Sequence, residues 1–504
     1  MICRPLSARL PALFGAFLLT VMAAPAIAQD ALPAAVQQAL RQADLPADAL
    51  AAVALPLSGS PWLRPWQHRA QVPMQPASTM KLLTSIVALD RLGPNHRGHT
   101  ELRSAAPLAG GALQGDLVLK GGADPELGVP QLWALLLDLR QAGVTHIAGN
   151  LLVDRSLFRP ARFDQGLPPF DESPEFGYNV IPDALLLAGN LLPLEIRATE
   201  TGVTASTVPA LPGLEITSLM TLSQRACSNW DDDWKPARVV QQAGLTQIEL
   251  NGAFPRGCTQ RTALQLIDRQ ELTERLFRTL WQGLGGTWAG RALEQAAPAG
   301  TRVLARRQSR PWGEVLRHLN KTSDNALTRL LFLELGVPAM ASEPQATTRE
   351  LADRAVRQWL AQHGIADAGL VLDNGSGLSR SERITPWQLA SMLRVAHAGR
   401  FAAELAMSLP VAGVDGGLRR RLADSPAAGW ARLKSGTLRN VVALAGYVND
   451  AEGRPWAVAL MVNHDRASVA RPVLDALVDH IARHGPHGPR WPNPAAPGPQ
   501  GDGP

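Results

Sequence analysis

The feature that most constrains the fold is a change in the hydrophobic pattern along the chain, from helical periodicity to short strand-like runs and back to helical periodicity. From Ser78 to Leu92 the apolar residues follow helical spacing, and Gly93-Pro94 ends the run. From about His96 to Leu264 short apolar pieces alternate with Gly and Pro turns, a pattern typical of β-rich domains. After Leu264 the helical periodicity returns. The two ends therefore indicate one domain, interrupted by an insertion of about 170 residues that suits one or two further domains.

Both helices and strands are predicted outside this insertion. The runs 50–57, 441–449 and 456–463 are apolar, and Asp450-Ala451-Glu452-Gly453 between the last two is a hairpin signal. Helical spacing occupies residues 31–42, 272–284, 311–319, 326–335, 351–363, 387–396 and 467–484. We therefore expect an α/β fold of the α+β type, in which an antiparallel sheet carries helices on its faces.

The N-terminus has the three parts of a secretory signal. Arg4 and Arg9 precede an apolar run from Leu10 to Ala24, and Ala26-Ile27-Ala28 forms a small-residue exit. The expected organisation is a cleaved signal at 1–28, one domain at 29–95 and 265–484, inserted domains at 96–264 and a disordered Pro/Gly-rich tail at 485–504. The mature protein is then expected in the periplasm.

Charge and cysteine content narrow the function classes. Lys+Arg 49 against Asp+Glu 44 gives +5, and removal of Arg4 and Arg9 with the signal leaves 47 minus 44, or +3. Such a balance argues against nucleic-acid binding, although peripheral membrane contact and any oligomeric state remain open. Once Cys3 is removed with the signal, Cys227 and Cys258 form one pair in an oxidising compartment, and a disulfide is favoured over two free thiols.

We predict no metal or cofactor. His96 and His99 stand at helical spacing, but Gly98 and Pro94 favour a loop and no third ligand is evident.

Three short motifs carry the chemistry: Ser78-Thr79-Met80-Lys81, Ser323-Asp324-Asn325 and Lys434-Ser435-Gly436. A three-residue spacing on a helix places the first serine and lysine on one face, within reach of each other. A serine hydroxyl attacks a carbonyl only if a base takes its proton, and a lysine can do so once burial or a neighbouring cation lowers its pKa. The chain has only five lysines, and two of them stand in these motifs.

The motifs and their order resemble those of the D-alanyl-D-alanine carboxypeptidase/endopeptidase family, the DacB-type class C low-molecular-mass penicillin-binding proteins. Further similar segments are Gly115–Pro125 (GDLVLKGGADP), Asp154–Phe158 (DRSLF) and Asn374–Arg380 (NGSGLSR). The long gap between the first two motifs is also typical of the family, which inserts two domains there.

The resemblance implies a transpeptidase-like fold, related to the β-lactamases, and an acyl-enzyme on Ser78. It gives Lys81 as base, Ser323 and Asn325 as the second motif, and Lys434, Ser435 and Gly436 as the third. The amides of Ser78 and Thr437 would form the oxyanion hole. Asp154, Phe158 and Arg380 would contact the stem peptide. Two departures are Ser435, where the family usually has threonine, and Asn374, with Asp373 one position earlier.

The implied substrates are peptidoglycan stem peptides and cross-links, with β-lactams as covalent inhibitors. Two alternatives stay open. One is a non-catalytic cell-wall binding protein on the same fold, and the other is a β-lactamase or esterase.

Overall fold

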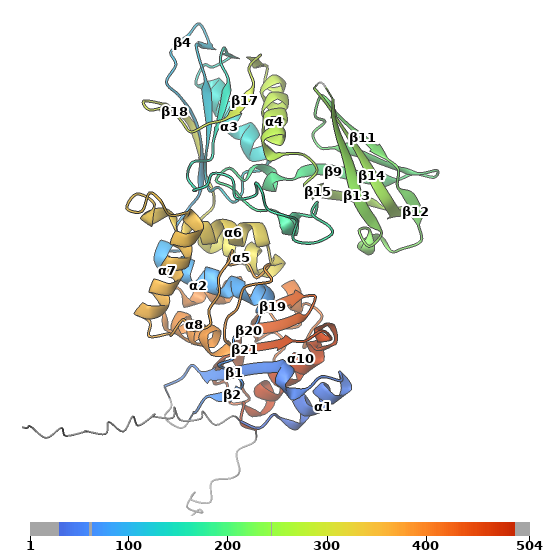
Figure 1. The fold of residues 1–504 in the computed structure, drawn as a ribbon, viewed down its shortest axis with the longest axis vertical. Helices are drawn as coiled ribbons and strands as arrows, with labels where there is room; N and C mark the ends of the chain where they lie inside the picture. The colour runs from blue at the N-terminus through green and yellow to red at the C-terminus, as the bar shows by residue number, and fades with distance from the viewer. Residues whose placement is uncertain (1–29, 60–62, 243, 489–504) are drawn as a thin grey trace, which may run out of the picture.

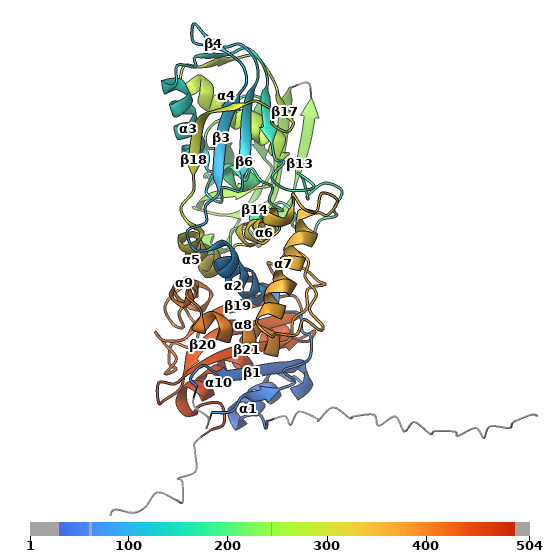
Figure 2. The same ribbon diagram turned by 90° about the vertical axis from the view of Figure 1, so that its left-hand side faces the viewer.

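The computed structural model describes residues 30–59, 63–242 and 244–488. The predicted signal at 1–28 and most of the predicted tail lie outside these residues. Figures 1 and 2 show an elongated molecule in which a body of sheet and helices carries the inserted part at one end. Both ends of the described chain belong to the body.

The body is built on one antiparallel sheet with the strand order β19-β20-β21-β1-β2. Its strands are β1 (Leu50–Pro56), β2 (Trp66–His68), β19 (Arg432–Leu438), β20 (Val441–Asn449) and β21 (Pro455–Asn463). The predicted strands at 50–57, 441–449 and 456–463 and the hairpin between the last two are confirmed. Strand β19, which carries the third motif, was not predicted, and it is an edge of this sheet.

Both faces of the sheet are buried, because its strands alternate between two apolar clusters. In β21, Ala457, Ala459 and Met461 join the cluster on one face, whereas Val458 and Leu460 join the cluster on the other. Side chains on a strand alternate with a period of two, so one apolar run supplies both cores. Alanines dominate the first face, and their small size lets helices lie close to the strands there.

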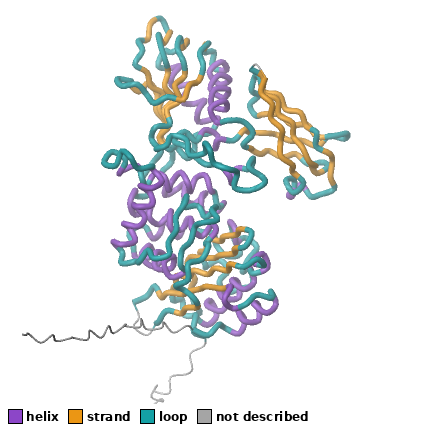
Figure 3. Tube along the Cα trace, viewed as in Figure 1, coloured by secondary structure: helices purple, strands orange, loops and turns teal. Residues whose placement is uncertain are grey.

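Helices cover both faces, which confirms the predicted architecture. Helices α1 and α10 pack on one face, α8 packs on the other, and α2 lies against α8, α5, α6 and α9. The body helices are α1 (Ala34–Gln42), α2 (Met80–Leu92), α5 (Trp312–Thr322), α6 (Asn325–Glu334), α7 (Thr348–Gln362), α8 (Pro386–Ala398), α9 (Ala402–Ser408) and α10 (Arg471–His484). Figure 3 shows how they enclose the sheet.

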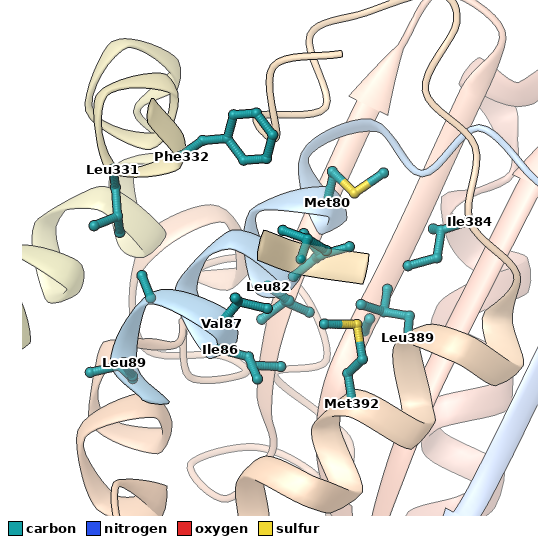
Figure 4. Close-up of a cluster of buried hydrophobic side chains, with 14 of the residues drawn as sticks. Met80, Leu82, Ile86, Val87, Leu89, Leu331, Phe332, Ile384, Leu389 and Met392 are labelled. Atoms are coloured by element: carbon teal, nitrogen blue, oxygen red, sulfur yellow. The ribbon is translucent and has the colours of Figure 1, made fainter. Parts of the chain in front are cut away.

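Helix α2 is the buried centre of the body. Every residue from Met80 to Leu89 is buried, and Figure 4 shows its Leu82 and Ile86 among Leu389 and Met392. A helix that is apolar on all sides must be enclosed by other elements. This burial fixes the helix whose first turn carries Lys81.

The first inserted part consists of two sheets and two helices. One sheet has the order β17-β8-β6-β3-β18 and the other β16-β7-β5-β4. The elements are β3 (His99–Ser104), β4 (Leu108–Ala109), β5 (Ala112–Leu113), β6 (Leu117–Gly122), α3 (Val129–Gln141), β7 (His146–Ile147), β8 (Leu151–Asp154), α4 (Arg269–Gly283), β16 (Thr287–Trp288), β17 (Ala292–Glu294) and β18 (Arg302–Gln308).

The second inserted part is all β and interrupts the first. Its elements are β9 (Leu192–Ala198), β10 (Val203–Thr207), β11 (Leu214–Ser218), β12 (Thr221–Ser223), β13 (Trp234–Gln242), β14 (Leu245–Pro255) and β15 (Thr259–Leu264). They form the orders β10-β9-β15 and β11-β14-β12, with β13 paired to β14. The predicted disulfide between Cys227 and Cys258 is present here, with Cα atoms 5.5 Å apart.

The predicted end of the insertion at residue 264 is wrong. Strand β18 pairs antiparallel with β3, and β17 pairs parallel with β8, so residues up to Gln308 complete sheets that begin at His99. The run at 272–284 is helical as predicted, but as α4 it packs on α3 and β17 in the inserted part. Local periodicity identified the helix correctly and could not show which sheet it covers.

The two connections between body and insertion lie side by side. Trp312 donates its amide to the carbonyl of His96 at 2.8 Å, and Gly313 donates to Pro94 at 2.9 Å. The imidazole of His96 pairs with the buried carboxyl group of Glu334. His99 begins β3 rather than lying in the predicted loop. The insertion thus leaves the body after α2 and returns directly before α5.

No helix within the described ranges is both long and apolar enough to cross a membrane.

Candidate active site

The first motif lies where a 3-10 turn, Ala77–Thr79, leads into α2. Ala77 has a φ of 46°, in the left-handed region that costs a residue with a Cβ free energy. Gly377 packs so tightly on this turn that a Cβ at Gly377 would stand 1.9 Å from the Ala77 carbonyl oxygen. The turn that presents Ser78 is therefore held by its surroundings rather than by its own preference.

Lys81 Nζ touches three acceptors. It lies 3.1 Å from Ser78 Oγ, 2.6 Å from Asn325 Oδ1 and 2.5 Å from the Ser376 carbonyl oxygen. An ammonium group has three N–H donors, whereas a neutral amine has two donors and one lone pair. Asn325 Oδ1 and the Ser376 carbonyl oxygen can only accept, so they take the two N–H donors of the neutral amine. In that neutral form the remaining lone pair is available to accept the proton of the Ser78 hydroxyl 3.1 Å away, which is the geometry that a general base needs.

The environment of Lys81 favours this neutral form. The side chain is completely buried, and this burial lowers its pKa well below the usual value. The charge of Lys434 lowers the pKa of Lys81 further, and Arg329 acts in the same direction. The charges of Glu382 and Asp324 oppose the shift by raising this pKa. The sequence analysis named burial or a second cation as sufficient to lower the pKa of Lys81, and both act here.

The second motif forms the junction between α5 and α6. Ser323 ends α5 with φ 63° and ψ 41°, and Asp324 begins α6 by accepting a hydrogen bond from the amide of Leu327 at 2.9 Å. This junction places Asn325 in the first turn of α6. Asn325 Nδ2 donates to the carbonyl of Tyr178 at 2.9 Å, while its Oδ1 accepts from Lys81. Both ends of the amide are therefore fixed.

The third motif lies on β19, beside the other two. Lys434 Nζ donates to Ser323 Oγ at 2.9 Å and to the Ser435 carbonyl at 2.7 Å, and burial lowers the pKa of Lys434 to about 7. A Cβ on Gly436 would stand 2.8 Å from the amide nitrogen of Ser78, so glycine permits the strand to approach the first motif. Ser435 turns its hydroxyl toward Gly417, where an added Cβ would be 2.5 Å away.

The remaining predicted substrate residues are not all in one place. Thr437 is exposed on the edge strand. Asp154 is buried in the inserted part, where its two carboxylate oxygens accept from the amides of Ser156 and Ala297. Phe158 is 2% exposed and belongs to the core. The third residue predicted to contact the stem peptide, Arg380, lines a pocket.

That pocket has a volume of about 580 Å³ and lies between the 163–182 segment, α6 and the 373–381 segment. Its walls are apolar, with Phe170 and Phe332 among them, and carry a few charged groups. Arg380 lies over the ring of Phe170, 5.4 Å from its centroid, and donates to the Phe170 carbonyl at 3.2 Å. An apolar pocket with a few convergent charges is the usual form of a ligand site.

Sequence reasoning missed the groups that act through their backbone. The carbonyls of Ser376 and Tyr178 hold Lys81 and Asn325, and neither has a side-chain signature. Asn374, the departure from the family pattern, accepts through Oδ1 from both the amide and the hydroxyl of Ser376, as an aspartate there would also do. Within the described residues, no group of three or more His, Cys, Asp or Glu side chains is arranged to hold a metal ion.

Comparison with known proteins identifies the family to which the chain belongs. The chain matches the family model of the D-Ala-D-Ala carboxypeptidase 3 (S13) family over residues 32–484. It is 30% identical to a D-alanyl-D-alanine carboxypeptidase of Actinomadura sp. (strain R39) over 82% of this chain and 77% of that protein. It is 27% identical to the D-alanyl-D-alanine carboxypeptidase DacB of Haemophilus influenzae over 77% of this chain and 80% of that protein.

A solved structure shares the fold. The crystal structure of penicillin-binding protein 4 (DacB) from Haemophilus influenzae superposes with a TM-score of 0.74 at 23% identity, over 89% of this chain and 99% of that one. The family match covers the body, the insertion and all three motifs. The chain therefore belongs to the D-Ala-D-Ala carboxypeptidase 3 (S13) family, and it is a peptidase.

Proposed function

We propose that this protein is a serine-type D-Ala-D-Ala carboxypeptidase and endopeptidase of the periplasm. It would act on peptidoglycan stem peptides and cross-links through an acyl-enzyme on Ser78, and β-lactams would inhibit it by acylating the same serine. The observation that carries the proposal is the 3.1 Å contact between Ser78 Oγ and the fully buried Nζ of Lys81, with the other two motifs hydrogen-bonded around it.

In the acylation step the lone pair of Lys81 takes the hydroxyl proton as Ser78 Oγ bonds to the carbonyl carbon of a D-alanine residue. The developing oxyanion is held by the amides of Ser78 and Thr437, which border the close approach of β19 at Gly436. The C–N bond then breaks. The leaving nitrogen takes a proton from the Ser323 hydroxyl, which Lys434 replenishes across their 2.9 Å hydrogen bond.

Before deacylation the proton on Lys81 passes to Lys434, so Lys81 is a neutral amine again and Lys434 regains its charge. A water molecule then gives a proton to the amine of Lys81 while its oxygen attacks the acyl carbon. The ester bond to Ser78 breaks, and Lys81 returns a proton to Oγ. The products are a shortened peptide with a free carboxylate and an enzyme restored to its first state.

Substrate recognition is assigned to the edge strand and the pocket. The terminal carboxylate of the peptide would approach Lys434, with the hydroxyls of Ser435 and Thr437 beside it. Arg380, which lines the pocket, would contact the side chain of the stem peptide. The contact of Asp154 and Phe158 with the peptide stays a prediction, and both side chains have protein partners instead in this structure.

Defined muropeptides test the proposal. The purified protein should release D-alanine from uncross-linked pentapeptides, divide cross-linked dimers and be labelled by a fluorescent penicillin. Retention of muropeptides without release of D-alanine would support the non-catalytic alternative. Rapid turnover of nitrocefin without action on muropeptides would support a β-lactamase instead.

A further inference from the structure

Glu382 is a completely buried acid that follows the third family-like segment. Its carboxyl group accepts four backbone amide hydrogen bonds. Asp373, Asn374 and Gly375 donate to Oε1 at 3.2, 3.0 and 2.7 Å, and Gly377 donates to Oε2 at 2.9 Å. Successive amides of this kind form a concave anion site, and here the anion belongs to the chain itself.

The loop that wraps this carboxylate, residues 373–377, also touches the 77–84 segment, which contains the first motif, at three points. Its Ser376 carbonyl accepts from Lys81 Nζ at 2.5 Å, and its Gly375 carbonyl accepts from Thr84 Oγ1 at 2.7 Å. Gly377 packs on the carbonyl of Ala77, beside the nucleophile. The position of this loop therefore determines where the Ser376 carbonyl stands relative to Lys81.

The hydrogen bonds fit the ionised form of Glu382. Each of the four contacts above is donated to the carboxyl oxygens. Burial raises the pKa of Glu382, and the amides of Asn374, Gly375 and Asp373 lower it in opposition. The charge of Asp373 raises the pKa of Glu382 as well. In its ionised form Glu382 also brings a negative charge near Lys81, which otherwise faces Lys434, Asp324 and Arg329.

We propose that Glu382 is a positioning residue for the acylation of Ser78: by holding the 373–377 loop it fixes the carbonyl that orients the amine of Lys81 toward the Ser78 hydroxyl. The inference rests on the proposed serine mechanism and extends it to an acid that acts through the 373–377 loop. Without the carboxylate, four amides lose their acceptor and the loop is free to move. Misplacement of a catalytic group by about 1 Å can cost on the order of a hundredfold in rate.

The test compares Glu382→Gln with Glu343→Gln, an exposed acid that pairs with Arg354 away from the site. The second-order rate constant for acylation by a fluorescent penicillin is measured against pH, with thermal melting as a folding control. Glutamine keeps one acceptor oxygen and turns its amide hydrogens toward an N–H group, so we expect a fall of about ten- to a hundredfold. Glu343→Gln should match the wild type.

The pH profile separates positioning from general loss of structure. Acylation requires neutral Lys81, so its rate rises with pH through the pKa of Lys81. Because the charge of Glu382 raises that pKa, its removal should move the acid limb of the profile to lower pH. A folded Glu382→Gln protein with the wild-type rate and an unmoved acid limb would overturn the inference.

A second variant covers the case in which Glu382→Gln does not fold. Thr84→Val keeps the shape of the side chain and removes only the hydrogen bond to the Gly375 carbonyl. It should lower the acylation rate without moving the acid limb, and an unchanged rate would count against control by the loop. If the wild-type protein itself is not labelled, the proposed function fails first, and the two failures are thereby distinguished.

Discussion

Lys81 and Asn325 are 244 residues apart in the chain, yet Nζ of the first lies 2.6 Å from Oδ1 of the second. This contact joins the first motif to the second across the whole insertion. A hydrogen bond from Lys434 Nζ to Ser323 Oγ joins the third motif to the second. The three motifs thus form one hydrogen-bonded set.

Ser78→Ala should abolish labelling by fluorescent penicillin and release of D-alanine, because the variant has no oxygen to form the acyl bond. Its melting temperature should stay near that of the wild type, since one hydroxyl is lost from a site at the end of a helix. Ser342→Ala, at an exposed serine, is the matched control and should be labelled fully. Covalent labelling that persists in Ser78→Ala would disprove the assignment of the nucleophile.

Lys81→Arg should be almost inactive although it keeps the positive charge. The guanidinium group does not lose its proton in proteins, so it cannot act as a base. General base catalysis contributes about a hundredfold to ten-thousandfold, and we expect a fall in the acylation rate of that size. Lys235→Arg, at an exposed lysine, should leave the rate unchanged. An active Lys81→Arg enzyme would point to a different base.

Lys434→Gln should move the acid limb of the acylation profile to higher pH. The positive charge of Lys434 lowers the pKa of Lys81, so its loss lets that pKa rise and Lys81 becomes neutral only at higher pH. The effect is greatest below about pH 7, where Lys434 itself carries its charge. Acylation rates measured across pH test this, and an acid limb that stays in place would remove Lys434 from this role.

Gly436→Ala should impair acylation far more than stability. The new Cβ would stand 2.8 Å from the amide nitrogen of Ser78 and 2.9 Å from the Pro76 carbonyl oxygen. Either β19 or the turn that carries Ser78 must therefore shift. We expect a loss of about a hundredfold in the acylation rate. Gly283→Ala, near the end of α4 and with open space around it, is the control. Equal rates in the two variants would show that the close approach is unimportant.

The disulfide should matter for stability and not for catalysis. Cys227 and Cys258 are 31 residues apart, and a loop of that length restricts the unfolded chain by about 3 to 4 kcal/mol in the chain-entropy model. Cys227→Ser with Cys258→Ser should therefore lower the free energy of unfolding. The rate of penicillin acylation should not change, and a large fall in that rate would reveal coupling between this part and the site.

The sequence predicts the elements whose signal is local. The helix of the first motif and the final hairpin follow from apolar spacing alone. Strand β19 was missed because RLKSGTL has no clear alternation, and α3 was missed because it lies among Gly and Pro turns. The boundary at residue 264 was wrong because the pairing of β18 with β3 joins segments about 200 residues apart.

The candidate site also has some parts that the sequence predicts and others that it does not. The serine, lysine and asparagine motifs can be recognised in the sequence because the proposed chemistry depends on their side chains. The Ser376 carbonyl and the acceptor role of Glu382 cannot, because any residue supplies a carbonyl and a buried acid has no pattern of its own. These contacts depend on how the loop folds back onto α2.

The outgoing and returning connections of the insertion are hydrogen-bonded to each other, so a short turn from Pro94 to Trp312 would reconnect the body covalently. Such a shortened protein would still lose the carbonyl of Tyr178 that anchors Asn325, and the carbonyls of Asn179 and Val180 that hold Arg329. The insertion thus forms part of the wall of the candidate active site. Its removal would take hydrogen-bond partners from Asn325 and Arg329, although the chain would still contain every residue of the three motifs.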